Sequence, residues 1–187
     1  MTLSLAGRRQ LLSIAREAIA AAISGQRYAA PADPRGEVES SGAFVTLRHR
    51  GELRGCIGQI EALGPTAETV AHCAVSAATR DPRFPVLTLP ELRAGTEIEI
   101  SLLTPLQRVG SVEDIEVGRD GLLIEQGRFS GLLLPQVATE WGWDRDTFLA
   151  HTCRKAGLPD EAWKRGAEIY RFQAEIFSES TVDPPPG

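Results

Sequence analysis

Residues 96–103, TEIEISLL, alternate between polar and apolar side chains, and this stretch constrains the fold more strongly than any other. Successive side chains of an extended strand point to opposite faces, so a period of two predicts a half-buried β-strand. The predicted buried face carries three apolar side chains, Ile98, Ile100 and Leu102. The opposite face carries three polar ones, Glu97, Glu99 and Ser101.

Two predicted hairpins accompany this strand. Residues 43–49 have strand propensity, residues 50–52 have the composition of a turn, and residues 53–60 provide the return strand. The stretch DGLLIEQGRFSGLLL, which starts at Asp120, again reads apolar strand, glycine turn and apolar strand. A helical pattern follows each hairpin. The repetition indicates either a diverged internal duplication or the common recurrence of a hairpin followed by a helix.

The helices are predicted from apolar spacing and from their end signals. Residues 3–24 carry apolar side chains every three or four positions and end before Gly25. A second helix is expected from Thr66, as its N-cap, to about Ala78. A third helix is expected over RDTFLAHTCRKAGL and is ended by Gly157. Grouped strands with few helices predict an α+β fold with a mainly antiparallel sheet flanked by helices.

Composition and charge exclude several classes of protein. The 187 residues are 42% hydrophobic and 24% charged, which is typical of a globular chain, and the net charge of −5 argues against nucleic-acid binding. No run of 18 apolar residues predicts a membrane span. Three cysteines without a CxxC pair do not indicate a disulfide framework. A cytoplasmic protein with reduced thiols is therefore expected.

The stretch LRGCIG at residues 53–58 places Cys56 between Gly55 and Gly58, with Arg54 two positions before the thiol. Simple alternation would put Arg54 and Cys56 on one face, where a guanidinium favours the reactive thiolate. The glycines would leave the backbone open to a ligand. The alternative is that Cys56 is a small core residue beside a glycine bulge.

The stretch RDPRF at residues 80–84 is a second candidate, because Arg80 and Arg83 can form a fork for a carboxylate or phosphate. The alternative is an internal latch between Asp81 and an arginine, with Phe84 in the core. Glu99 would serve as a general base if its strand face lines a site, and otherwise belongs to a solvated face.

A metal site is not predicted. The histidines and cysteines that could contribute lack a recognised ligand spacing. They are His49, Cys56, His72, Cys73, His151 and Cys153. No nucleotide-binding or hydrolase motif is present either, so no cofactor is expected.

Six stretches in order along the chain resemble the AMMECR domain family, whose bacterial and archaeal members are called AmmeMemoRadiSam system protein A. They are LRGCIG, RDPRFPVLT, EIEISLLTP, GLLLPQVATEWGW, FLAHTCRKAGLP and IYRFQAEIF. The resemblance spans residues 8–178 as a single domain, and the polar tail 179–187 is expected to be disordered. It implies two unequal lobes with a cleft between them, lined by the LRGCIG stretch.

The resemblance also implies which residues form the site. The catalytic candidates are Cys56 and Glu99. The substrate-binding candidates are Arg54, Gly55, Gly58, Arg80, Asp81, Arg83 and Ser101. Family members are often encoded with a Memo-like protein and a radical-SAM protein, which are therefore expected partners. An enzyme-like protein acting on a small anionic or protein-borne substrate is the function expected. The alternative is a non-catalytic adaptor that binds a protein or peptide.

Overall fold

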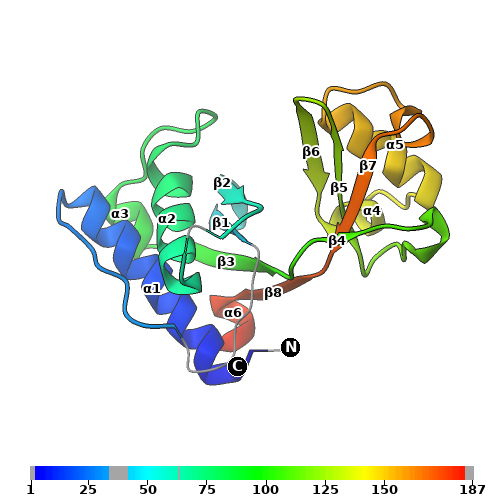
Figure 1. Ribbon diagram of the computed structural model, residues 1–187. Helices are drawn as coiled ribbons and strands as arrows, with labels where there is room; N and C mark the ends of the chain where they lie inside the picture. The colour runs from blue at the N-terminus through cyan, green and yellow to red at the C-terminus, as the bar shows by residue number, and fades with distance from the viewer. Residues whose placement is uncertain (1–2, 34–41, 63, 184–187) are drawn as a thin grey trace. The chain divides into compact units, whose positions relative to one another are not determined.

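The computed structural model describes residues 3–33, 42–62 and 64–183 (Figure 1). The chain divides into two compact units, one formed by residues 1–103 with 175–187 and the other by residues 104–174. Each unit is built on a four-stranded sheet. Part of the connection predicted over residues 29–42, namely residues 34–41, lies outside the described residues.

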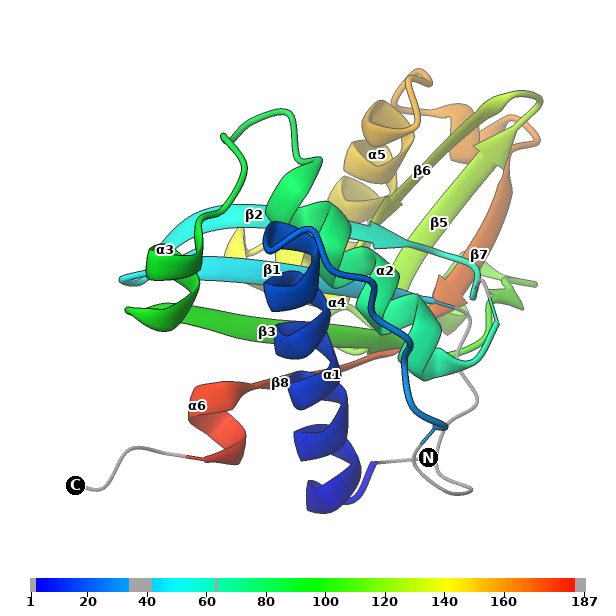
Figure 2. The same cartoon turned by 90° about the vertical axis from the view of Figure 1, so that its left-hand side faces the viewer.

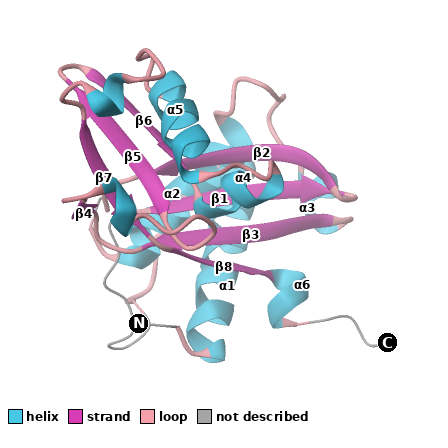
Figure 3. Ribbon diagram, turned by 90° about the vertical axis from the view of Figure 1, so that its right-hand side faces the viewer, coloured by secondary structure: helices cyan, strands magenta, loops and turns pink. Residues whose placement is uncertain are grey.

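The first unit packs helices on one face of a sheet whose strand order is β2-β1-β3-β8 (Figures 2 and 3). Strand β1 pairs antiparallel with both β2 and β3. The elements are α1 (Leu5–Ile23), β1 (Ala43–His49), β2 (Glu52–Gln59), α2 (Thr66–Thr79), α3 (Leu89–Arg93), β3 (Thr96–Leu103), β8 (Ala174–Ser178) and α6 (Glu179–Val182).

The core of this unit lies between the sheet and helices α1 and α2. The apolar side chains of β1 and β3 that face it, among them Val45, Leu47, Ile98 and Ile100, are fully buried. For Ile98 and Ile100 the alternating pattern predicted this burial. Their burial is the main source of stability for such a layered unit. The predicted hairpin, the long first helix and the strand at residues 96–103 are confirmed.

Helix α2 begins differently from the prediction. Its N-cap position is Pro65, and Thr66 is the first helical residue. The capping oxygens come from Asp33, whose carboxylate accepts the backbone N–H groups of Thr66 at 3.0 Å and Ala67 at 2.6 Å. A carboxylate at a helix N-terminus satisfies otherwise unpaired donors and complements the helix dipole. This cap comes from a distant segment, so local sequence does not reveal it.

The tail is more ordered than predicted. Residues 179–182 form helix α6, capped by the Ser178 hydroxyl, and Glu179 pairs with Arg16 of α1 at 2.6 Å. Arg16 also donates to the carbonyls of Leu92 and Thr96, so it links four elements of the unit. The expectation of disorder was therefore wrong for residues 179–182, and residues 184–187 lie outside the described residues.

The second unit has the strand order β4-β7-β5-β6, with antiparallel pairing between the neighbours. A core under its helices buries Leu122, Ile124, Phe148 and Leu149 completely. The elements are β4 (Gln107–Arg108), a 3₁₀ turn (Val112–Asp114), β5 (Gly121–Gln126), β6 (Phe129–Leu133), α4 (Pro135–Glu140), α5 (Arg145–Lys155), a second 3₁₀ turn (Ala162–Lys164) and β7 (Glu168–Phe172).

The two units repeat one topology. In each, a hairpin is followed by helices and then by a strand that pairs with the first strand of the hairpin, giving β2-β1-β3 and β6-β5-β7. The fourth strands are exchanged: β4 follows β3 in the chain but pairs with β7, whereas β8 follows β7 but joins β3. This arrangement agrees with the internal duplication considered from the sequence.

The predicted α+β class with antiparallel sheets flanked by helices is confirmed. The cleft that the family resemblance implies stays a prediction.

Candidate functional site

The stretch LRGCIG lies on β2, at the edge of its sheet, and it contains a β-bulge. A two-residue turn with positive φ at Arg50 and Gly51 pairs His49 with Glu52, and Arg48 then pairs with Leu53. The register shifts after this point, so that Leu47 pairs with Gly55. Arg54 is therefore the extra residue of the bulge.

The bulge decides which way Cys56 points. Without it, the register set by the turn would place Cys56 opposite Val45, whose side chain lies in the core. With it, Cys56 lies opposite Thr46 on the other face of the sheet. The predicted common face for Arg54 and Cys56 does not follow from the observed pairing, because the strand does not alternate regularly through the bulge.

Cys56 differs from the other two cysteines in exposure. It is half-buried, whereas Cys73 and Cys153 are buried. Burial raises the pKa of the Cys73 thiol to about 11 and also raises that of Cys153. The Thr46 hydroxyl donates to Cys56 Sγ at 3.4 Å. Cys56 is thus the cysteine best placed to react with a molecule in solution.

Asp81 and Arg83 hold the backbone of Cys56 from the open edge of β2. Asp81 Oδ2 accepts the Cys56 N–H at 2.9 Å, and Arg83 Nη2 donates to the Cys56 carbonyl at 3.2 Å. Arg83 and Asp81 pair at 2.7 Å, and the Asp81 side chain is only 2% exposed. The latch considered from the sequence therefore exists, and it brings Arg83 to the strand that carries Cys56.

The electrostatics of this latch follow from its contacts. The hydrogen bond from Arg83 is the largest influence that holds the pKa of Asp81 far below its usual range. The same pair raises the pKa of Arg83, and Coulombic attraction to Cys56 adds a smaller contribution. Arg83, rather than Arg54, is therefore the arginine that contacts Cys56, through the backbone carbonyl.

Arg54 instead anchors the loop that follows α2. Its Nε donates to Glu91 Oε1 at 3.0 Å, and Nη1 and Nη2 donate to the carbonyls of Pro85 and Val86. The side chain is only 12% exposed, and its hydrogen bond is the main reason that the pKa of Glu91 falls to about 2. Every nitrogen of this guanidinium has an acceptor within the protein.

Packing accounts for both glycines of the motif. A Cβ atom on Gly55 would lie 2.2 Å from the carbonyl oxygen of Ala77 in α2, and one on Gly58 would lie 2.2 Å from the ring of Phe44. Neither position accepts a side chain without movement of its neighbours. Gly131 of β6 is in the same situation, 2.3 Å from the backbone of Ala156 at the end of α5.

The remaining predicted residues are distributed over the same unit. Glu99 pairs with Thr46 across β3 and β1, so Cys56, Thr46 and Glu99 form one row over three strands. Ser101 is buried opposite Phe44 in the next row. Arg80 is exposed at the end of α2. Sequence reasoning missed Thr46, because its place beside the thiol depends on the bulge.

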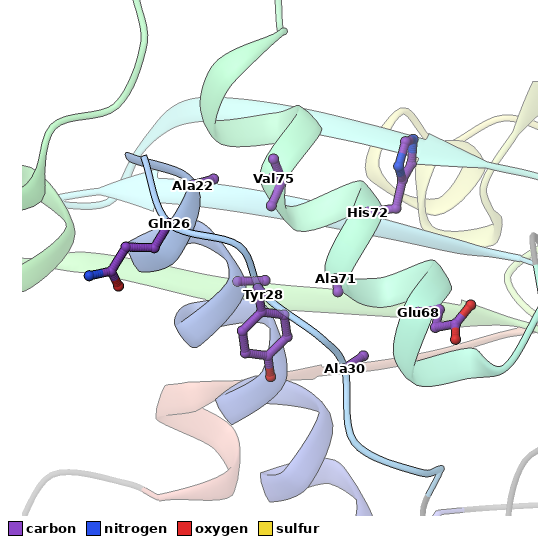
Figure 4. Close-up of a pocket in the computed structure, with 9 residues that line it drawn as sticks. Ala22, Gln26, Tyr28, Ala30, Glu68, Ala71, His72 and Val75 are labelled. Atoms are coloured by element: carbon purple, nitrogen blue, oxygen red, sulfur yellow. The ribbon is translucent and has the colours of Figure 1, made fainter. Parts of the chain in front are cut away.

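A separate cavity of about 320 Å³ lies between α1, α2 and the segment after α1 (Figure 4). Alanine side chains, including Ala22 and Ala71, form much of its wall, and Tyr28 lies across it. None of the residues predicted for the site lines this cavity.

Among the described residues, no group of three or more histidine, cysteine or acidic side chains is arranged to hold a metal ion. No described helix is long and apolar enough to cross a membrane.

Comparison with known proteins gives consistent matches over nearly the whole chain. A sequence model of the AMMECR1 family matches residues 12–177. A protein of Methanothermobacter thermautotrophicus is 46% identical over 180 residues, which cover 91% of this chain and 93% of the relative. Protein MJ0810 of Methanocaldococcus jannaschii is 45% identical over 174 residues, with coverages of 88% and 86%. The crystal structure of uncharacterized protein PH0010 from Pyrococcus horikoshii superposes with a TM-score of 0.83 at 41% identity, and the match covers 94% of this chain and 92% of that one.

Proposed function

This chain belongs to the AMMECR1 family, and we propose that it is an enzyme-like protein that uses the Cys56 thiol on a small anionic or protein-borne substrate. The observation that carries the proposal is the surroundings of Cys56. Cys56 is the half-buried cysteine of the three, its sulfur accepts a hydrogen bond from Thr46, and Arg83 donates to its backbone carbonyl.

Each neighbour has a role that its chemistry supports. The thiolate is the nucleophilic form of cysteine, and both a hydroxyl donor and a guanidinium stabilise negative charge on sulfur. Glu99 occupies the same row of side chains, one strand beyond Thr46, and would accept the thiol proton through water. Arg80 is exposed at the end of α2 and would contribute to the attraction of an anionic substrate.

Alkylation with iodoacetamide at pH 7 tests the thiol. In the folded protein we expect Cys56 to be labelled first, while buried Cys73 and Cys153 react only after unfolding. The variant R83Q should slow labelling of Cys56 by about 1.5- to 5-fold, the range for a largely exposed charge pair. Peptide mass spectrometry of quenched time points measures each rate.

The control is R80Q, which removes an exposed arginine of the same loop without removing the contact to the Cys56 carbonyl. It should label at the wild-type rate. The thiol proposal fails if Cys56 in the folded protein reacts no faster than a cysteine of the unfolded chain. Equal rates for R83Q and R80Q would remove Arg83 from the mechanism.

An adaptor function is the second candidate, and exposed apolar side chains in the LRGCIG stretch and in the loop bound to it favour this function. Leu53 is 39% exposed and Val86 is 56% exposed. Arg54 follows Leu53 in the chain and its guanidinium binds the Val86 carbonyl. Exposed apolar side chains held on fixed backbone are suited to protein contacts. The partners proposed are the Memo-like and radical-SAM proteins that the family resemblance implies.

Capture of each purified partner by the immobilised chain tests this surface. We expect V86E to reduce capture about tenfold, because it places an unpaired charge in an apolar contact. I176E is the matched control, since Ile176 is 41% exposed on β8 at the opposite edge of the same sheet. If the wild-type chain retains neither protein, the adaptor function loses its support.

A further inference from the structure

The second unit contains a polar cavity of about 290 Å³ that none of the preceding functions uses. Most of its lining residues carry side chains that donate or accept hydrogen bonds. The lining residues are Thr104, Gln107, Arg119, Asp120, Arg171, Phe172 and Gln173. A small concave site in which several polar groups converge is the usual form of a binding site for a small polar ligand.

Backbone pairing fixes one side of this cavity. Gln107 of β4 lies directly opposite Arg171 of β7, so their side chains are neighbours across the two strands. Just beyond this pair, Thr104 N donates to the Gln173 carbonyl, and Gln173 N donates to Thr104 Oγ1, both at 2.8 Å. The backbone that bears the Thr104 hydroxyl and the side-chain amides of Gln107 and Gln173 is therefore held in place by hydrogen bonds.

A buried carboxylate lies between the two arginines. Asp120 is 1% exposed, and it accepts hydrogen bonds from Arg119 Nε at 2.9 Å and Nη2 at 2.8 Å. The backbone N–H of Glu116 donates to Asp120 Oδ2 at 2.9 Å. Burial raises the pKa of Asp120, but these hydrogen bonds outweigh it, so that the pKa is lowered and the carboxylate stays charged. Arg119 is therefore committed to Asp120.

Arg171 has donors to spare. Its Nη1 donates to the Asp114 carbonyl at 2.6 Å and lies 4.0 Å from Asp120 Oδ2. Within the part of the chain that the structure describes, its Nε and Nη2 have no acceptor. The Arg171 side chain is 31% exposed, and it lines the cavity. Two adjacent N–H groups of one guanidinium match the spacing of two oxygens of a carboxylate or phosphate.

We infer that this cavity binds the oxyanion of a small phosphorylated or carboxylated molecule, with Arg171 as the primary contact. Gln107, Gln173 and Thr104 supply further donors around it. The volume of about 290 Å³ exceeds that of a bare phosphate, so the cavity has room for further atoms of such a molecule. The site lies in the other unit from Cys56 and does not depend on the proposed thiol chemistry.

Isothermal titration calorimetry of the full chain with inorganic phosphate and, separately, with malonate tests the site. We expect saturable binding of at least one of the two anions. Preference for phosphate identifies a phosphorylated ligand, and preference for malonate identifies a carboxylated one. The variant R171Q should weaken binding about tenfold or more, because it removes the charged fork.

The control is R128Q, which removes an arginine that lies over the Phe129 ring and outside the cavity. It should bind as wild type does. If R171Q does not fold, Q107A provides the second variant, since Gln107 is exposed on a two-residue edge strand, and it should weaken binding severalfold. The inference is overturned if neither anion binds with a Kd of about 1 mM or tighter, or if R171Q and R128Q bind alike.

Discussion

Replacing Gly55 with alanine is expected to destabilise the protein by about 3 kcal/mol, at the upper end of the cost of overpacking a close contact. The added Cβ would lie 2.2 Å from the Ala77 carbonyl oxygen, a backbone atom of α2 that cannot rotate away. Helix α2 or the edge strand must therefore shift. Urea unfolding of wild type and G55A, followed by circular dichroism, measures the change in the free energy of unfolding.

Two other glycines provide the comparison. G131A should have a similar cost, because its Cβ would lie 2.3 Å from the backbone nitrogen of Ala156. G110A should lie within about 0.5 kcal/mol of wild type, since no atom is within 4 Å of the added Cβ and φ is not positive there. If G55A were as stable as G110A, helix packing would not explain the glycine, and close approach of a ligand would become the better account.

The variant D81N is expected to lose about 2 to 3 kcal/mol at neutral pH, and to change how stability depends on acid. The buried Asp81 carboxylate accepts from the Cys56 N–H and from three N–H groups of Arg83. The asparagine side chain has one oxygen instead of two. Its NH₂ group would therefore face N–H groups whose hydrogen bonds the second carboxylate oxygen now accepts. Unpaired donors beside a buried group account for most of the expected loss.

The acid dependence has a definite sign. The folded-state pKa of Asp81 is held well below its ordinary value of 3.8, so the folded protein binds fewer protons than the unfolded chain. The stabilisation is fully present above about pH 4 and is lost as pH falls towards the folded-state pKa. The stability gap between wild type and D81N should therefore narrow in acid. Urea unfolding at a series of pH values measures it.

D183N is the matched control for this experiment. Asp183 also pairs with an arginine, Arg9, but its side chain is 64% exposed. Its loss should cost no more than about 0.5 kcal/mol, as is usual for an exposed pair. Should D81N be as stable as D183N at neutral pH, the latch of Asp81 with Arg83 would not contribute to the stability of the folded protein.

Much of the fold follows from local pattern. The hairpins, the strand at residues 96–103 and the first helix were predictable, because burial of alternating or helically spaced apolar side chains determines them. The Asp33 cap of α2 and the pair between Arg16 and Glu179 were not, since each joins segments far apart in the sequence. The polar composition of residues 179–182 predicted disorder, because the sequence does not reveal that Arg16 pairs with Glu179 of this helix.

The candidate site shows a subtler limit. The residues of LRGCIG and RDPRF were identified from the sequence, and the latch of Asp81 with Arg83 was among the alternatives. The partner of the thiol was not identified, because a hairpin of regular register places Val45, rather than Thr46, opposite Cys56. The one-residue bulge at Arg54 shifts the register, so that Cys56 lies opposite Thr46 on the other face of the sheet. No local propensity predicts this bulge.

The exchange of fourth strands gives the chain the connectivity of a strand-swapped dimer joined into one polypeptide. The first repeat contains β1–β4 and the second contains β5–β8. The last strand of each repeat joins the sheet of the other, since β4 pairs with β7 and β8 pairs with β3. A break between β4 and β5 would leave each fragment with three strands of one sheet and a fourth that belongs to its counterpart. Each four-stranded sheet is therefore completed by a strand from the other half of the chain, although the two cores are separate.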